Sequence, residues 1–79
     1  MMEELLGELK RLADENGGGR VVAVDIVVGA LAGISPDHLR EHFLESSPGS
    51  VAEGAVFRAR MSGDPLSTGL LIESMELER

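Results

Sequence analysis

The hydrophobic residues at the start of the chain recur every three or four positions. They are Met2, Leu5, Leu6, Leu9, Leu12 and Ala13, and this spacing predicts an amphipathic helix with one apolar stripe. Glu3 and Glu4 fall in the first turn, where the helix dipole favours acidic side chains. The run Asn16-Gly17-Gly18-Gly19 is expected to end the helix, because glycine readily adopts the left-handed backbone conformation found at helix ends.

Residues 20–29, with the sequence RVVAVDIVVG, change to a β-branched pattern that predicts a strand. One face of this strand is apolar and is expected to pack on the helices; it consists of Val22, Val24, Ile26 and Val28. The opposite face is mixed and is expected to be partly solvated or covered by a partner; it consists of Val21, Ala23, Asp25 and Val27.

A second helix is predicted after the glycine-bounded loop GALAGI. Ser35 is suited to the N-cap, because its hydroxyl can accept a hydrogen bond from a free amide of the first turn. Pro36 follows at the first helical position, where no amide donor is lost. The helix is expected to run to residue 45 or 46, with Leu39 and Phe43 facing inward.

Two more strands are predicted over residues 53–61 and about 68–78. In the first of them Ala55, Phe57, Ala59 and Met61 share one face, and Arg58 and Arg60 point the other way. In the second, Leu70 and Ile72 have one phase, whereas Met75 and Leu77 have the opposite one. A β-bulge near residues 73–74 would bring all four to a common face, because it inserts one extra residue.

The resulting element order is α-β-α-β-β. We expect an α+β, two-layer fold, in which two helices cover one face of a three-stranded mixed or antiparallel sheet. The turn Gly63-Asp64-Pro65 predicts that the second and third strands form a hairpin. The first strand reaches the second through a helix and should lie parallel to it, either beside it or separated from it by the third strand.

The composition narrows the classes of function. The chain has 79 residues, no cysteine and a formal net charge of −7. Such a charge repels phosphate, so we expect no nucleic-acid partner and no anionic membrane surface. The N-terminal sequence lacks the features of a signal peptide, and no apolar run is long enough to span a bilayer, so a cytoplasmic protein is predicted.

His38 and His42 are the first candidates for metal ligands, because residues at i and i+4 lie on one face of a helix. Two imidazoles there, assisted by Glu41 or Glu45, suit nickel, copper or zinc. The alternative is an ordinary polar helix rim. Two histidines are too few for a structural zinc site, so zinc is not expected as a cofactor.

No catalytic residue is predicted, and the chain is not expected to be an enzyme. Ser35, Asp37 and His38 are close in sequence, but Ser35 is explained as a helix cap, and catalytic triads depend on geometry rather than adjacency. A domain of this size also offers little room for a substrate pocket. An uncovered patch of Val21, Val27, Val56, Leu70 and Leu71 would instead favour self-association, as a homodimer, or binding of another protein.

The order and spacing of several segments resemble the N-terminal domain of the HypA/HybF family of hydrogenase nickel-incorporation proteins. The matching pieces are the helix after Met1-Met2-Glu3, the run RVVAVDIVVGALAGISPDHLREHF, the EGA of residues 53–55 and the closing STGLLIESMELE. They cover nearly the whole chain, residues 1–79, which is therefore interpreted as a single HypA-like domain.

The resemblance implies an accessory role in maturation of [NiFe]-hydrogenase or urease, with the metalloenzyme precursor or a maturation GTPase as partner. It also implies a nickel site at Met1, Met2 and Glu3, where the family begins Met-His-Glu. Methionine replaces that histidine here, and SGDPLS stands where the family carries a cysteine-rich zinc ribbon. We therefore predict that nickel binding is weakened or lost; the alternative is a metal-free protein-interaction module with the same fold.

Overall fold

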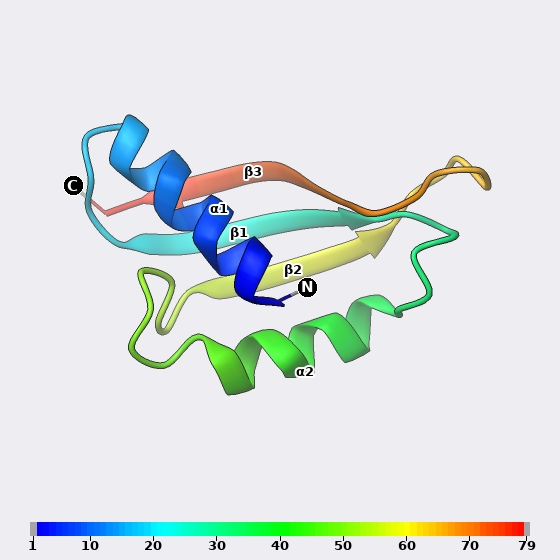
Figure 1. The fold of residues 1–79 in the computed structure, drawn as a ribbon, viewed down its shortest axis with the longest axis horizontal. Helices are drawn as coiled ribbons and strands as arrows, with labels where there is room; N and C mark the ends of the chain where they lie inside the picture. The colour runs from blue at the N-terminus through cyan, green and yellow to red at the C-terminus, as the bar shows by residue number, and fades with distance from the viewer. Residues whose placement is uncertain (1, 79) are drawn as a thin grey trace.

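The computed structural model describes residues 2–78, which form two helices and a three-stranded sheet (Figure 1). The elements are α1 (Met2–Glu15), β1 (Val21–Val28), α2 (Pro36–Ser46), β2 (Val56–Met61) and β3 (Leu70–Leu77). The sheet order is β2-β1-β3, with β1 parallel to β2 and antiparallel to β3. The predicted α+β class and element order are confirmed, and the sheet is of the mixed kind.

Helix α1 buries the stripe that its sequence predicts. Leu5, Leu9 and Ala13 are buried, and the neighbouring apolar side chains of the helix are half-buried beside them. The helix ends as expected, since the Gly18 amide donates to the Ala13 carbonyl over 2.8 Å and Gly17 has a positive φ of 100°.

Helix α2 also begins and ends where the sequence indicates. The Ser35 hydroxyl accepts a hydrogen bond of 3.1 Å from the His38 amide, and Pro36 occupies the first turn. Leu39 and Phe43 have no exposed surface, which fixes the inward face of the helix. Both histidines lie beside this inward face and are exposed.

The predicted hairpin between the second and third strands is wrong. β2 and β3 lie on opposite sides of β1, so the segment between them crosses the end of β1 (Figure 1). Backbone hydrogen bonds hold this crossing: the Gly29 amide donates to the Gly69 carbonyl and the Leu31 amide to the Ser67 carbonyl. A Cβ on Gly29 would lie 2.7 Å from the Ser67 oxygen, so only glycine fits there.

The strands contain two irregularities in register. Ser74 pairs with Asp25 and Ile72 with Ile26, so Glu73 is an extra residue in β3, which confirms the predicted bulge. A second shift between Val21 and Ala23 was not predicted. It turns Val21 into the core, with 1% exposure, and leaves Val22 39% exposed, so their predicted faces are wrong.

One core lies between the sheet and both helices. Phe43 of α2 and Phe57 of β2 stack with ring centroids 4.4 Å apart. The buried residues around them are Leu5, Leu9, Ala13, Val21, Val24, Ile26, Val28, Leu39, Ala52 and Ala55. Met61 was expected on this inward face but is 46% exposed, because it lies at the last position of β2.

Candidate functional site

Of the three N-terminal residues predicted to bind nickel, the structure describes two, Met2 and Glu3. Met1 lies outside the described residues. Met2 is the first residue of α1 and packs, half-buried, against the core, whereas Glu3 is exposed. The thioether of Met2 is thus occupied by apolar contacts, and it is also a softer donor than the nitrogen and oxygen ligands that Ni(II) favours.

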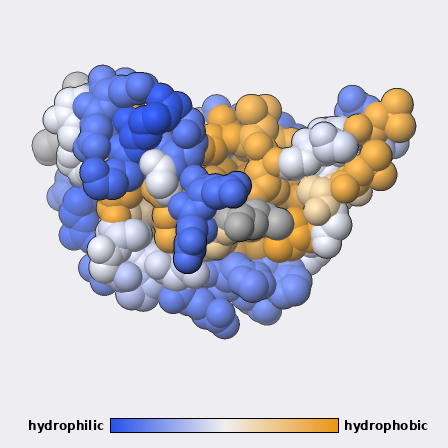
Figure 2. Space-filling view, in the orientation of Figure 1, coloured by the Kyte–Doolittle hydropathy of each residue, from blue (hydrophilic) through white to orange (hydrophobic). Residues whose placement is uncertain are grey.

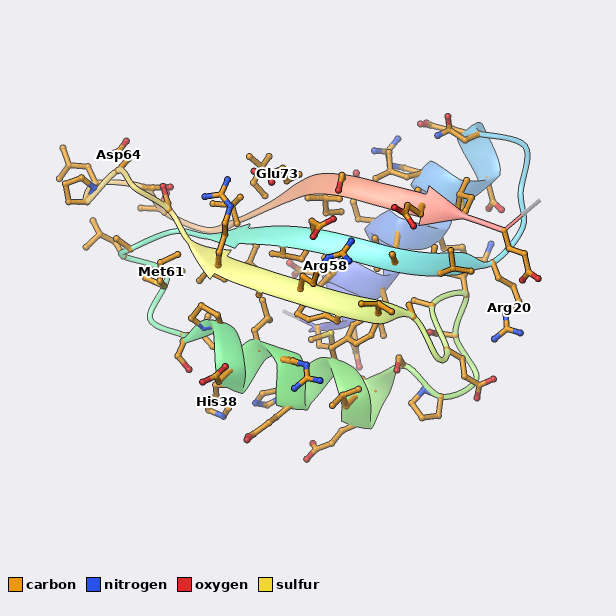
Figure 3. All side chains as sticks on the ribbon, turned by 180° about the vertical axis from the view of Figure 1, so that it is seen from behind. Arg20, His38, Arg58, Met61, Asp64 and Glu73 are labelled. Carbon is orange, nitrogen blue, oxygen red and sulfur yellow. The ribbon has the colours of Figure 1, made fainter. Side chains whose placement is uncertain are left out.

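The two histidines of α2 converge. His38 Nε2 and His42 Nε2 lie 3.2 Å apart, and the ring centroids are separated by 4.8 Å. Both residues are exposed, and Figure 3 shows His38 projecting from α2 on the side away from the sheet. The helix therefore brings together the predicted imidazole pair.

The fold also brings His42 to the beginning of α1. Met2 and His42 both line a small cavity of about 120 Å³, whose other walls are Ile34 and Leu39. The sequence separates these two residues by forty positions, and no local pattern predicts that they meet. One member of each set of candidate metal ligands, Met2 and His42, consequently lies beside the other.

Neither set is a complete cluster. Among residues 2–78, no group of three or more histidine, cysteine, aspartate or glutamate side chains is placed to hold one ion. The carboxylates of Glu41 and Glu45, which the sequence suggested as helpers, thus do not complete a site with His38 and His42. An ion bound here would take its remaining ligands from water or from another molecule.

The outer face of the sheet carries a polar network that sequence analysis missed. Arg58 donates to both carboxylate oxygens of Asp25, over 2.6 and 3.1 Å, and the Ser74 hydroxyl donates to the same carboxylate over 2.6 Å. These hydrogen bonds lower the pKa of Asp25 to about 2, with Arg58 as the largest cause and Ser74 next. Beside it, Arg60 pairs with Glu73 at the bulge.

This network changes the expected apolar patch. Val21 and Leu70 face the core, and the ion pairs lie among the remaining members of the set. Val56 and Leu71 are exposed, at 55% and 62%, but they are on opposite edge strands. The sequence showed that Asp25 and Val27 share one face of β1. It could not show which residues pair with Asp25, because these depend on the register of β1 with β2 and β3.

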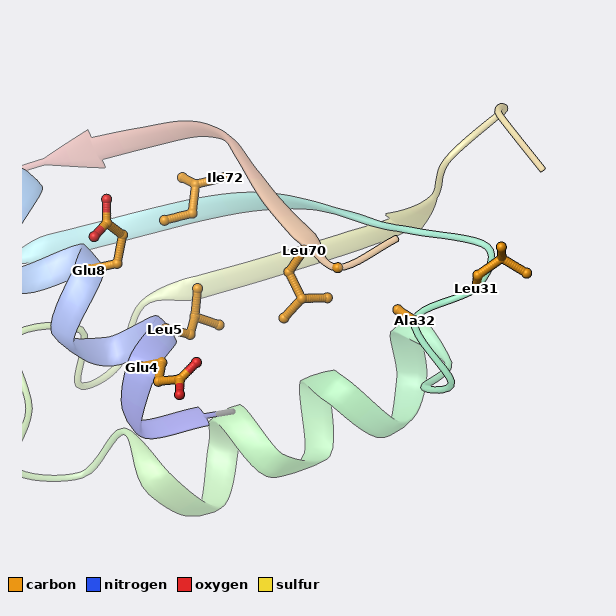
Figure 4. A pocket seen from close by; sticks show the side chains of 8 residues that line it. Glu4, Leu5, Glu8, Leu31, Ala32, Leu70 and Ile72 are labelled. Atoms are coloured by element: carbon orange, nitrogen blue, oxygen red, sulfur yellow. The ribbon is translucent and has the colours of Figure 1, made fainter. Parts of the chain in front are cut away.

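A groove lies between α1 and the segments that cross the end of β1 (Figure 4). Its volume is about 480 Å³, and its lining includes Leu5, Leu31, Leu70 and Ile72, with Glu4 and Glu8 at the helix side. The prediction that the domain offers little room for a pocket is therefore wrong. A hydrogen bond from Arg11 lowers the pKa of the Glu8 carboxyl.

Hydrophobic side chains gather on the same side of the molecule (Figure 2). They extend from the middle of the view to the protruding segment between β2 and β3. Leu31 is 60% exposed, and Leu66, which belongs to that segment, is 76% exposed. Asp64 shapes the segment by accepting a hydrogen bond of 2.9 Å from the Leu66 amide.

Comparison with known proteins finds two similar curated sequences. The hydrogenase maturation factor HypA of Chlorobaculum tepidum is 44% identical over 43 residues, which are 54% of this chain and 38% of that protein. HypA of Chlorobium limicola is 49% identical over 39 residues, which are 49% of this chain and 34% of that protein. The chain carries a HypA-like region. A search of family models gave no match.

The HypA-like region accounts for about half of the chain, and the matched segments span little more than a third of each curated relative. The absence of cysteine means that this chain has no thiolate ligand for zinc. Between residues 2 and 78, neither helix is long and apolar enough to cross a membrane.

Proposed function

We propose that this chain is an accessory protein in the maturation of a nickel enzyme, a [NiFe]-hydrogenase or a urease. The observation that carries the proposal is the similarity, at 44% and 49% identity, to two proteins named hydrogenase maturation factor HypA. The chain as a whole would serve as one HypA-like domain without a zinc ribbon. Its partners would be the precursor of the metalloenzyme or a maturation GTPase.

We further propose that nickel binding at the N-terminus is weakened or lost. Met2 stands where the resemblance implies histidine, and its side chain packs against the core. Glu3 is exposed and keeps a carboxylate available, but a carboxylate and backbone donors form a poorer nickel site than a set that includes imidazole. The proposal therefore predicts that restoring the imidazole restores the site.

The experiment is a calorimetric titration of Ni(II) into untagged protein that begins with an authentic Met1. A Met2→His variant is expected to bind nickel more tightly than the wild type, and Met2→Gln is the matched control for a polar side chain without a strong nickel ligand. Equal nickel binding by wild type and Met2→His would contradict the proposed weakening.

The maturation role has its own test. Purified chain is titrated with the metalloenzyme precursor and with the maturation GTPase of the same organism, without nickel and with nickel. Saturable binding to either partner supports the accessory role. Binding to neither, under conditions in which a complete HypA binds, would refute that role whatever the nickel titration gives.

The second candidate is a metal-free protein-interaction module that can self-associate. The groove beside α1 favours it, because apolar lining and the exposed Leu31 offer a contact surface. Sedimentation over a concentration series measures this directly, with Leu31→Ser as the variant and the exposed Leu44→Ser on α2 as the matched control. A monomer at every concentration would exclude self-association.

A further inference from the structure

The imidazole pair on α2 has a geometry that goes beyond a shared helix face. The two Nε2 atoms lie 3.2 Å apart, and the ring planes are tilted by 46°. The helix that carries them is held at its start by the Ser35 cap and along its inner side by fully buried Leu39 and Phe43. The backbone positions of His38 and His42 are therefore fixed by packing and capping that do not involve the imidazoles.

We propose that His38 and His42 form a two-imidazole site for a divalent ion of the late first-row transition metals, of the class of Ni(II), Cu(II) and Zn(II). Nitrogen–metal distances are about 2.0–2.1 Å for histidine, so an ion bridging the pair would make an angle of about 100° with the two nitrogens. Such an angle suits neighbouring ligands of a tetrahedral or square-planar ion. The inference stands independently of the proposed maturation role.

The same contact has a competing explanation, a hydrogen bond between two neutral imidazoles. In that arrangement the protonated Nε2 of one ring donates a hydrogen bond, and the unprotonated Nε2 of the other ring accepts it. Both rings are exposed, so water competes for each nitrogen and the hydrogen bond stabilises the fold little. An ion replaces the shared proton and uses both lone pairs, which requires that Nδ1 carry the hydrogen in each ring.

The electrostatic surroundings favour a cation. Helix α2 contains Asp37, Glu41 and Glu45 against one arginine, Arg40, and the whole chain has a net charge of −7. No salt bridge found among residues 2–78 involves a side chain of α2, in contrast to the paired charges of α1. With only two protein ligands, the ion keeps positions open for water or for donor atoms of another molecule.

The test is a titration of the full chain with Ni(II), Cu(II), Zn(II) and Mg(II), followed by calorimetry and by thermal unfolding. Wild-type protein is expected to bind Ni(II), Cu(II) and Zn(II) saturably, with Cu(II) bound more tightly than Ni(II). It is expected not to bind Mg(II), which prefers oxygen ligands. Saturating Ni(II) should raise the unfolding midpoint, because the ion binds only the arrangement found in the folded helix.

The decisive variant keeps the number of histidines but removes the i, i+4 spacing that brings the two imidazoles together. His38→Gln/Arg40→His places the two imidazoles at i and i+2, where they do not face each other. This variant and His42→Gln are expected to lose saturable Ni(II) binding and the midpoint shift. Both changes are at exposed positions, so the unfolding midpoint without metal should stay near that of the wild type.

Two outcomes would overturn the proposal. Unchanged Ni(II) binding in His38→Gln/Arg40→His would mean that the histidines act without the convergent geometry, or not at all. Because Met2 lies beside His42, a one-residue extension before Met1 is titrated in parallel. Binding that is lost with the extension but kept in both histidine variants would assign the ion to the N-terminus instead.

Discussion

The two faces of the sheet are organised by different forces. The inner face packs Phe57, Val24 and Ile26 against the helices, with no more than 5% of any of these residues exposed. The outer face joins its strands through Asp25 and Arg58, whose side chains are 29% and 55% exposed. Apolar burial grows with the area removed from water, whereas an exposed ion pair is screened and contributes little.

The difference explains what each face does. The inner face supplies most of the stability and positions α2, and through it the imidazole pair. The outer face specifies neighbours, because Asp25 receives hydrogen bonds from β2 on one side and from β3 on the other. The following predictions test this contrast, beginning with the largest expected effect.

Phe57 and Arg58 are consecutive residues of β2 on opposite faces. Phe57→Ala removes a ring that stacks on Phe43, and we expect it to lower the free energy of unfolding by about 3–5 kcal/mol. Arg58→Ala should have a much smaller effect, because water replaces the guanidinium at the Asp25 carboxylate. Urea unfolding measures the loss of free energy of unfolding in each variant. Equal losses in Phe57→Ala and Arg58→Ala would contradict the contrast between the two faces.

The bulge at Glu73 lets β3 present four apolar side chains to the core. Deletion of Glu73 removes the extra residue, so β3 alternates regularly and Leu70, Ile72, Met75 and Leu77 stay on one face without a bulge. Because no apolar side chain changes face, we expect the free energy of unfolding, measured in urea, to change by less than about 1 kcal/mol, and a larger loss would contradict the role of Glu73 as an extra residue. Glu73→Ala is the control, since it removes the ion pair with Arg60 but keeps the extra residue.

Because of the second irregularity, at the start of β1, the same substitution should have a large effect on stability at one valine and a small effect at another. Val24→Thr introduces a hydroxyl at a position without exposed surface and is expected to cost about 1–2 kcal/mol. Val22→Thr makes the same chemical change at an exposed position and should alter stability by less than about 0.5 kcal/mol. Thermal unfolding of the two variants would show equal effects if β1 alternated regularly.

Asp25 gives the smallest effect and a dependence on pH. Its pKa of about 2 in the folded chain lies below the ordinary value of 3.8. The ionised carboxylate therefore stabilises the fold fully above the ordinary value, and this contribution disappears as the pH falls from 3.8 through about 2. Asp25→Asn should be less stable than wild type at neutral pH and approach it in acid. A constant difference across this range would contradict the assignment.

The helices and the existence of the strands could be predicted from local pattern. The stripe of α1, the cap of Ser35 and the phase slip in β3 each depend on residues close together in the chain, and all three predictions are confirmed. The predicted hairpin failed because Gly63-Asp64-Pro65 makes a turn without specifying which strand follows it in the sheet. The segment between β2 and β3 is long enough to cross the end of β1. Gly29 permits the crossing, because it has no side chain to collide with residues 67–69.

The candidate site divides in the same way. The spacing of His38 and His42 on one helix face follows from the sequence, because helical periodicity is local. The position of Met2 beside His42, the groove beside α1 and the partners of Asp25 arise only when distant segments pack. Local sequence determined the two helices, the cap of α2 and the phase slip of β3. Tertiary structure alone decided which elements meet and which of Val21 and Val22 faces the core, because strand order and register depend on contacts between residues far apart in the chain.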